Sequence, residues 1–333
     1  MPDVLGATPD HPDRPEGHDV VVVGASMGGV EALRALAAGL PAEFPAAVVV
    51  VVHTAADGPG LLAEVLDHAG PLPAAFARDG EPLQPGHIVV APPDAHVLLT
   101  ERGVRLSRGA RENRARPAVD PLFRSAAVTY RSRVIGVILT GYLDDGAAGL
   151  RAIAQCGGLA VVQDDAAYPD MPRAALAAVP KAHRVALDGL AALLQDLVAR
   201  PAPVPPPVPQ RLADEARITE RGMADIDTMD RLGPRSSATC PDCGGTLWLL
   251  EKDDTGSDRY RCHTGHAYTE QTLYASQTEA TEQALYVALR TLEQRAQMLR
   301  RMAEQYGTGY AGHADELDRH ADILRGVLVQ THV

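Results

Sequence analysis

Two side chains that can do hydrolytic chemistry each follow a run of valines. Ser26 comes after the valines at 20–23, within the stretch GASMG at 24–28. The G-x-S-x-G pattern is typical of a sharp strand-to-helix turn that exposes the serine hydroxyl and the N–H groups behind it. His53 ends a second valine run at 48–52. Because carboxyl ends of neighbouring parallel strands meet at one edge of a sheet, Ser26 and His53 are expected to face each other.

Two other roles for Ser26 compete with that of a nucleophile. A dinucleotide-binding turn requires glycine at this position and an acidic residue roughly twenty residues further on. The sequence has neither feature. A serine before a helix also often caps that helix. The choice between the nucleophile and the cap therefore depends on whether a third group is present.

An aspartate that could complete a triad follows a third apolar run. The run VIGVIL at 134–139 leads into TGYLDDGA at 140–147, which contains Asp144 and Asp145. An aspartate at the carboxyl end of a strand can orient the imidazole of His53 and stabilise its charged form. Either aspartate could instead cap the helix expected at 148–154. The residues alone leave these two roles evenly divided.

Between about residues 20 and 200, strand-like runs alternate with helical stretches. This order predicts an α/β domain with a doubly wound, mostly parallel sheet that has helices on both faces. The expected strands lie at 20–23, 47–52, 87–91, 134–140, 159–162 and 184–187. Two further runs, at 94–100 and 103–107, predict an antiparallel hairpin added to this sheet.

Five stretches in this order resemble the catalytic domain of chemotaxis-type protein-glutamate methylesterases, the CheB family. They are GASMGG at 24–29, His53 after its valine run, GHIVVAPPDAHVL at 86–98, Asn113 followed by RPAVDPLFRSA at 116–126, and LTGYLDDGA at 139–147. QDD at 163–165 and MPRAA at 171–175 extend the likeness. The resemblance covers residues 18–198.

The resemblance implies a serine hydrolase of methyl esters on receptor glutamates, with glutamine deamidation as a further family activity. Ser26 matches the nucleophile, His53 the base, and Asp145 rather than Asp144 the orienting acid. The family needs no cofactor for catalysis. Four residues are assigned to binding the oxyanion or the substrate: Met27, Gly28, Tyr142 and Arg116. The amide of Met27 is the first candidate donor to the oxyanion, because Met27 directly follows the nucleophile.

The sequence departs from the family pattern close to these residues. Met27 replaces a hydroxyl residue, and Leu143 replaces a glycine after Tyr142. Classical members of the family also carry a phosphoacceptor receiver domain ahead of the catalytic domain, whereas only about seventeen residues precede the first expected strand here. We therefore expect no receiver domain in this sequence. These departures favour an alternative function, a signalling adaptor whose esterase site has decayed, and a small-ester hydrolase is a third alternative.

Composition excludes several classes of partner. The sequence has 31 basic and 43 acidic residues, a net charge of −12, which argues against binding nucleic acid or an acidic membrane surface. No apolar run is long enough to insert in a membrane, and the polar residues 1–17 are expected to be a disordered tail rather than a signal peptide. Three of the four cysteines cluster in a metal-like pattern. A cytoplasmic protein is predicted.

Three cysteines and a histidine in the second half predict a metal site. CPDC at 240–243 and CHTGH at 262–266 offer two ligand pairs on tight turns, the spacing of a tetrahedral structural zinc site. We assign Cys240, Cys243, Cys262 and His266 as ligands, with His263 as the substitute. A zinc-ribbon-like motif at 238–268 is expected to follow a proline-rich linker and polar segment at 199–237, with one helix at 213–229.

The last part of the sequence predicts a helical hairpin at 269–333. Apolar residues recur at steps of three and four until Gly307 and Gly309 interrupt them, and a second helical pattern follows. An intramolecular hairpin competes with a homodimer or a partner-binding surface. The full prediction is a methylesterase domain at 18–198, whose substrate is a methylated receptor or signalling protein, joined to this zinc-ribbon-like and helical module.

Overall fold

The computed structural model describes residues 17–58, 60–250 and 258–330. The chain forms two compact units, one extending to Thr272 and the other beginning at Leu273. Apart from Gly17, the expected disordered tail lies outside the described residues, and the other expected domain bounds remain predictions. Among the helices that the structure describes, none combines the length and apolarity needed to cross a membrane.

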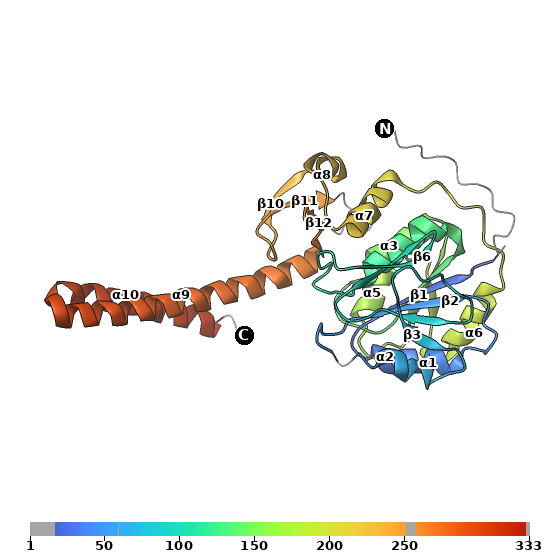
Figure 1. Cartoon of the computed structure of the whole chain (residues 1–333), viewed down its shortest axis with the longest axis horizontal. Helices are drawn as coiled ribbons and strands as arrows, with labels where there is room; N and C mark the ends of the chain where they lie inside the picture. The colour runs from blue at the N-terminus through green and yellow to red at the C-terminus, as the bar shows by residue number, and fades with distance from the viewer. Residues whose placement is uncertain (1–16, 59, 251–257, 331–333) are drawn as a thin grey trace. The chain divides into compact units, whose positions relative to one another are not determined.

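A parallel sheet of seven strands lies at the centre of the first unit (Figure 1). The chain builds the sheet outward from β1 on one side, then crosses to the other side at β7, so the strand order reverses between β1 and β7. This confirms the predicted doubly wound sheet, with a short unpredicted edge strand, β3. Across the sheet the order is β3 (Ala74–Phe76), β4 (Ile88–Val90), β2 (Ala47–Val52), β1 (Val20–Ala25), β7 (Val134–Ile138), β8 (Leu159–Gln163) and β9 (His183–Val185).

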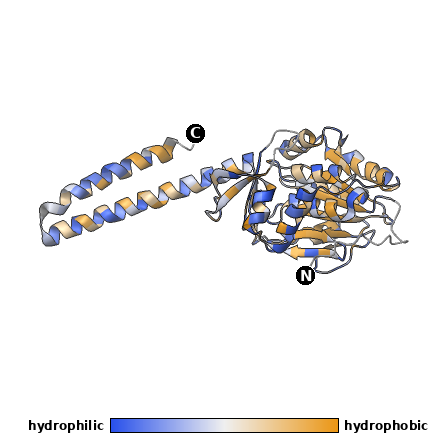
Figure 2. Ribbon diagram, turned by 90° about the horizontal axis from the view of Figure 1, so that it is seen from above, coloured by the Kyte–Doolittle hydropathy of each residue, from blue (hydrophilic) through white to orange (hydrophobic). Residues whose placement is uncertain are grey.

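Alternate side chains of the strands enter two separate apolar cores, one on each face of the sheet. Val20 and Val22 pack in the core that contains residues of α3 (Val119–Tyr130), α4 (Ala147–Gln155) and α5 (Asp170–Ala178). Val21 and Val23 pack in the core of α1 (Gly29–Gly39), α2 (Leu62–Asp67) and α6 (Leu187–Val198). Burial on both faces explains why the strands are continuous apolar runs, which Figure 2 shows in the hydrophobic colour.

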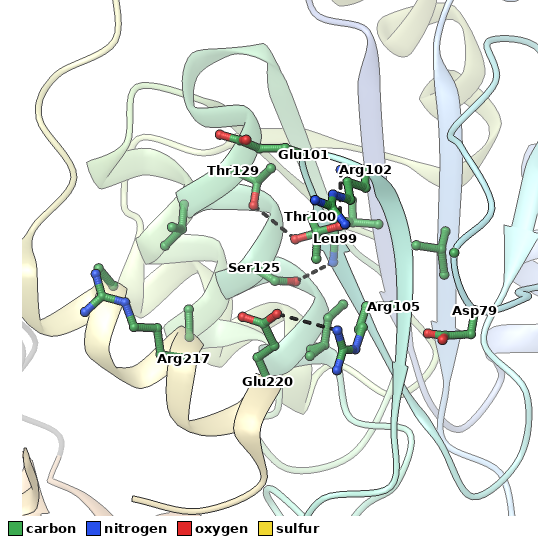
Figure 3. A pocket seen from close by; sticks show the side chains of 16 residues that line it. Asp79, Leu99, Thr100, Glu101, Arg102, Arg105, Ser125, Thr129, Arg217 and Glu220 are labelled. Atoms are coloured by element: carbon green, nitrogen blue, oxygen red, sulfur yellow. Dashed lines mark hydrogen bonds and ion pairs between the residues drawn. The ribbon is translucent and has the colours of Figure 1, made fainter. Parts of the chain in front are cut away.

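The predicted hairpin forms, but it does not join the sheet. β5 (His96–Thr100) and β6 (Gly103–Ser107) pair only with each other, so the expected addition to the sheet is wrong. The reason is that α3 satisfies the backbone of β5. Leu99 N donates to Ser125 Oγ at 3.0 Å, and Thr129 Oγ1 donates to Leu99 O at 3.0 Å (Figure 3). These bonds replace those that a neighbouring strand would make.

The single helix expected at 213–229 is two helices, α7 (Gln210–Arg221) and α8 (Ile226–Leu232). Gly222 ends α7 in the left-handed conformation at φ 81°. Asp225 then starts α8 by accepting a hydrogen bond from Thr228 N at 2.7 Å. Such a glycine after a helix and an aspartate before one are common end signals.

An antiparallel sheet, here called the ribbon, follows α8 within the first unit. Its strands, in spatial order, are β10 (Arg235–Thr239), β11 (Thr246–Leu250), β12 (Arg259–Cys262) and β13 (Ala267–Thr269). Trp248 and Leu250 pack with Met229 and Leu232 of α8 and with Ile218 of α7 in a small apolar core.

A buried cluster of opposite charges joins the ribbon to α7 and α3. Arg261 of β12 lies 2.8 Å from Glu112, and Glu112 also pairs with Arg124 of α3 at 2.7 Å. Arg259 of β12 lies 2.7 Å from Glu215 of α7. Because burying an unpaired charge is strongly unfavourable, these side chains require one another. The ribbon is therefore packed on the sheet domain rather than merely tethered to it.

The second unit is a helical hairpin, as predicted. α9 (Glu270–Tyr306) ends at Gly307, where φ is 108°, and α10 (Ala311–Gln330) runs back beside it (Figure 1). Arg325 pairs with Glu293, and Arg300 pairs with Asp318, across the two helices. Ala296, on α9, and two alanines of α10 are almost fully buried at the contact.

Replacing Gly24 by alanine should destabilise the first unit. A Cβ at Gly24 would lie 2.3 Å from Val119 Cγ1, and Val119 is fully buried and β-branched. We expect a loss of about 1–3 kcal/mol in the free energy of unfolding, measured by denaturant titration. Gly326→Ala in α10, where the new Cβ meets nothing within 4 Å, should leave the first transition unchanged. Equal stability of Gly24→Ala and wild type would contradict this packing.

Acid should weaken the charge cluster. Burial alone would raise the pKa of Glu215, but Arg259 and Arg124 lower that pKa to about 2. Below the ordinary glutamate pKa, the unfolded chain takes up a proton while folded Glu215 stays ionised, so stability contributed at neutral pH is lost as pH falls from about 4.5 toward 2. Glu215→Gln should cost roughly 3 kcal/mol at pH 7, and the difference from wild type should narrow between pH 4.5 and pH 3. A pH-independent difference would exclude this explanation.

Candidate active site

Ser26 lies directly after β1, at the turn into α1. Gly28 adopts the left-handed conformation at φ 75° and is the residue that caps α1, without a side-chain cap bond. The alternative that Ser26 caps the helix is therefore wrong. Its Oγ instead lies 3.1 Å from His53 Nδ1. Gly141, which follows β7, packs closely against Ser26: a Cβ at Gly141 would lie 2.7 Å from the Cβ of Ser26.

His53 follows β2, and its ring lies between Ser26 and Asp145. Its Nε2 is 2.7 Å from Asp145 Oδ2. An ionised carboxylate only accepts hydrogen bonds, so the proton of neutral His53 belongs on Nε2 and Nδ1 is free to accept from the Ser26 hydroxyl. The ring nitrogens are exchanged relative to chymotrypsin-like triads, but each still has the partner that base chemistry requires.

Asp145, which follows β7, is 2% exposed and accepts four hydrogen bonds. Oδ2 accepts from His53 and from Val119 N at 2.7 Å. Oδ1 accepts from Asn113 Nδ2 at 2.9 Å and from Asp120 N at 3.1 Å. Burial alone would raise the pKa of Asp145, but His53 and these donors hold that pKa below its ordinary value. The carboxylate is thus ionised and fixed in position.

Asp144 has a different environment and does not contact His53 in the described hydrogen bonds. Its Oδ1 accepts from Thr269 Oγ1 at 2.9 Å. Burial raises the pKa of Asp144 to about 6. Gly146 is the residue that caps α4, without a side-chain cap bond, so neither aspartate takes the alternative role of a helix cap.

The backbone N–H groups of Met27 and Gly28 have no acceptor among the described residues. The N–H of Ser26, in contrast, donates to Thr140 O at 3.0 Å. Thr140 Oγ1 donates to Met27 O at 3.1 Å, which fixes the peptide that follows the serine. Two N–H groups beside the Ser26 hydroxyl are therefore available to a ligand.

Arg116 and Tyr142 lie at the edge of this site with partners of their own. Arg116 donates to Asp94 Oδ1 at 3.0 Å and to Gly109 O at 2.8 Å. Tyr142 is half exposed and meets Tyr168 edge-on, with ring centroids 5.0 Å apart.

A hollow of about 410 Å³ opens beside His53. Leu143 lines it in the left-handed conformation at φ 63°, at the position where the family has glycine. The full lining is His53, Thr54, Ala55, Ala56, Arg111, Asn113, Arg114, Ala115, Arg116 and Leu143.

A larger hollow lies elsewhere and contains no predicted site residue. Its volume is about 590 Å³, and it lies between the β5–β6 hairpin, α3 and α7 (Figure 3). Arg105 and Glu220 approach within 3.9 Å across it.

The four predicted metal ligands come together at the ribbon. Their ligand atoms all lie within 4.8 Å of one another. Cys243 Sγ is 3.8 Å from Cys262 Sγ, which is 3.5 Å from His266 Nδ1. Two zinc–sulfur bonds of about 2.3 Å at a tetrahedral angle place the sulfurs about 3.8 Å apart. The residues therefore fit a tetrahedral metal ion such as zinc, and the substitute, His263, is not part of the cluster.

Sequence reasoning gave no role to Asn113, although the structure places it against Asp145. Its Nδ2 also donates to Asp120 Oδ2 at 2.9 Å, and its φ of 50° is one that asparagine tolerates better than most residues. It is the only asparagine in the chain. Asn113 carries no periodic signal, so the sequence marked it only as the first residue of the family-like stretch that continues with RPAVDPLF, without a role.

The part of the chain that forms the parallel sheet is similar to known proteins. The profile of the family described as CheB methylesterase matches residues 21–194. The chain is 44% identical over 167 residues to "Protein-glutamate methylesterase/protein-glutamine glutaminase 2" of Anaeromyxobacter dehalogenans, covering 50% of this chain and 49% of that protein. It is 36% identical over 179 residues to a "Putative protein-glutamate methylesterase/protein-glutamine glutaminase" of Leptospira interrogans, covering 53% of this chain and 93% of that protein. The chain thus spans about half the length of the first relative.

Comparison with solved structures points to the same family. The crystal structure of the Thermotoga maritima CheB methylesterase catalytic domain is 33% identical, with a TM-score of 0.52, and the match covers 54% of this chain and 98% of that one. The profile match contains most of the parallel sheet together with Ser26, His53 and Asp145. The chain therefore belongs to the CheB methylesterase family.

Proposed function

We propose that this chain is a protein-glutamate methylesterase, which hydrolyses glutamate methyl esters on receptor proteins and releases methanol. The observation that carries the proposal is the hydrogen-bonded row of Ser26, His53 and Asp145 at the sheet edge where the strand order reverses. Functional groups of doubly wound sheets gather at such a point. Glutamine deamidation, which the names of the relatives include, is the companion activity that we propose.

In the first step, Ser26 Oγ attacks the ester carbonyl carbon while His53 Nδ1 takes its proton. The negative charge that develops on the carbonyl oxygen is received by the N–H groups of Met27 and Gly28, each such donor being worth about 3–4 kcal/mol in the transition state. Collapse of the tetrahedral intermediate breaks the bond to the methoxy oxygen. His53 returns its proton to that oxygen, methanol leaves, and Ser26 carries the acyl group.

In the second step, water attacks the acyl carbon and gives a proton to His53; the tetrahedral intermediate then breaks its bond to Ser26 Oγ, which takes the proton back from His53. Asp145 stays ionised throughout and stabilises the imidazolium that forms twice in the cycle. The products are the free glutamate carboxyl group and Ser26 with its hydroxyl restored.

The hollow beside His53 is the proposed place for the receptor segment. Arg111 and Arg114 line it with Asn113, and cationic side chains favour an acidic helix rich in glutamate. Arg116 supports this wall through Asp94, and Tyr142 lies at the edge of the hydrolytic site. A cytoplasmic location, where the receptor methylation segments lie, completes the proposal.

We propose a structural zinc ion at the ribbon, bound by Cys240, Cys243, Cys262 and His266. Four protein ligands leave no open position, so the ion would stabilise the turn between β12 and β13 rather than take part in hydrolysis. The helical hairpin of α9 and α10 is the proposed contact for a second copy or another partner, because it exposes large apolar side chains such as Tyr286, Met298 and Ile323.

Ser26→Ala should abolish methanol release from methylated receptor fragments. The expected fall in kcat is about 10⁴-fold or more, because the nucleophile and base act as one unit. His53→Ala should give nearly the same value, and the double variant should not be slower than either. Ser236→Ala, at a half-buried serine of the ribbon, should retain wild-type turnover.

A wild-type protein that is folded and metal-loaded but releases no methanol would instead favour the decayed adaptor. Hydrolysis of small esters only, with receptor fragments untouched, would favour the third alternative.

Purified chain should contain one zinc ion, measured by elemental analysis. Cys243→Ser should lose it, because a serine hydroxyl is a poor ligand for zinc. Cys156→Ala, at a buried cysteine outside the cluster, should keep it. Retention of a full equivalent of zinc by Cys243→Ser would refute the assigned ligand set.

A further inference from the structure

The turn that holds two of the metal-ligating side chains also contacts the loop beside the triad acid. Cys262 ends β12 and His266 precedes β13, and the residues next to them make the contacts. Asn113 N donates to Ala267 O at 2.8 Å, and Ala267 N donates to Arg111 O at 3.4 Å. Residues 111–113 thus form a short pairing with β13 of the ribbon.

An ion pair from β12 also holds residues 111–113 against the turn between β12 and β13. Arg261 precedes the ligand Cys262, is fully buried, and lies 2.8 Å from Glu112, which is 2% exposed. Arg261 Nη1 also donates to Gly265 O within the turn at 3.1 Å. One guanidinium therefore links the shape of the metal-binding turn to the residue that precedes Asn113.

Asn113 transmits this position to the triad. Its backbone is held by β13, and its Nδ2 donates to Asp145 Oδ1 at 2.9 Å. Asn113 and Arg114 both have left-handed φ values, 50° and 69°. A tight turn of this kind has little freedom to move its side chain independently of its backbone, so a shift of β13 moves the amide that Asp145 accepts from.

A second contact reaches the neighbouring aspartate. Thr269, the last residue of β13, donates from Oγ1 to Asp144 Oδ1 at 2.9 Å, and both side chains are buried. The ribbon therefore holds the segment around Asp145 through Asp144 as well as through Asn113.

We propose that the turn between β12 and β13, when its Cys262 and His266 bind a metal ion together with Cys240 and Cys243, positions Asn113 against Asp145 and so sets the rate of ester hydrolysis. Asn113 is a positioning residue, since it acts through Asp145 and not on the substrate carbonyl. The proposal rests on the proposed function. Its physical basis is that none of the residues in the ribbon's small apolar core comes from β12, β13 or the turn between them, so a bound metal would supply free energy that keeps Arg261 and Ala267 in place.

The test is a cycle of zinc removal and Asn113→Gly in the full chain, with kcat measured on methylated receptor fragments. Glycine is chosen because it accepts the positive φ while deleting the amide. Chelation should lower wild-type kcat roughly 10- to 100-fold, the scale of a displaced catalytic group, and Zn²⁺ should restore it. Zinc-loaded Asn113→Gly should show a similar loss, and chelating that variant should change its kcat by less than about twofold.

Equal losses of kcat on chelation in both proteins would overturn the proposal, because the metal would then act independently of Asn113. An unchanged wild-type kcat without zinc would overturn it as well.

The tautomer of His53 gives a readout that does not depend on activity. In ¹⁵N-labelled, zinc-loaded wild type, the ring shifts should report a proton on Nε2 and a bare Nδ1. Zinc removal and Asn113→Gly should each move the shifts toward a mixture of the two tautomers. Shifts that stay at the wild-type values in both cases would contradict the proposal. If wild type releases no methanol, the proposed function fails, but these shifts still decide the inference.

If chelation unfolds the first unit, Arg261→Met tests the contact between Arg261 and Glu112 with the metal ligands left intact. It removes the ion pair to Glu112 while retaining all four ligands, and it should reproduce the kcat loss and the His53 shifts. Asp230→Asn is the matched control, because Asp230 of α8 accepts from Trp248 Nε1 of β11 at 2.7 Å and pairs with Arg235 of β10, and none of the described hydrogen bonds joins these residues to residues 111–113. Its kcat and shifts should equal those of wild type. An effect of Asp230→Asn as large as that of Arg261→Met would show only general loosening of the ribbon and would refute a specific path.

Discussion

The ionised, buried carboxylate of Asp145 is the constraint on which the site depends. A charge at this depth is stable only where hydrogen-bond donors replace water, and Asp145 has four. They come from the end of β2, the first residues of α3 and the loop that carries Asn113. Three segments far apart in the chain must therefore converge before His53 can be oriented. The sheet provides this because its strand order reverses between β1 and β7, which brings the ends of these two strands, before Ser26 and Asp145, to the same edge of the sheet.

The need for four donors around Asp145 also involves the ribbon. Its β12 and β13 strands contribute buried charges and backbone hydrogen bonds to the loop that supplies one of the four donors. Glu112 has Arg124 and Arg261 on either side, and burial without them would be prohibitive, so the ribbon and the sheet domain stabilise each other. In this family member, a turn that carries two of the proposed metal ligands thus lies two residue contacts from the proposed triad.

The sequence predicted the strands of the sheet well because burial on both faces produces valine runs that few other structures require. It also singled out Ser26, His53 and Asp145, which lie in hydrogen-bond contact, and four cysteine and histidine residues whose ligand atoms lie within 4.8 Å of one another, since their chemistry and spacing are distinctive. It failed where tertiary contacts decide. The β5–β6 hairpin does not join the sheet because Ser125 and Thr129 hydrogen-bond to the backbone of β5. No local sequence pattern indicated that Asn113 would hydrogen-bond to Asp145. Gly222, which ends α7, is a local signal in the sequence for the break between α7 and α8.

We propose that Ser26 is an activated nucleophile and not an unreactive hydroxyl in a decayed site. Mass spectrometry of the full chain after treatment with a fluorophosphonate, which reacts only with activated serines, is the sharpest test. One adduct is expected on the peptide that contains Ser26, and none in His53→Ala. A folded, zinc-loaded chain that remains unlabelled at Ser26, or that is labelled equally without His53, would show that His53 does not activate Ser26.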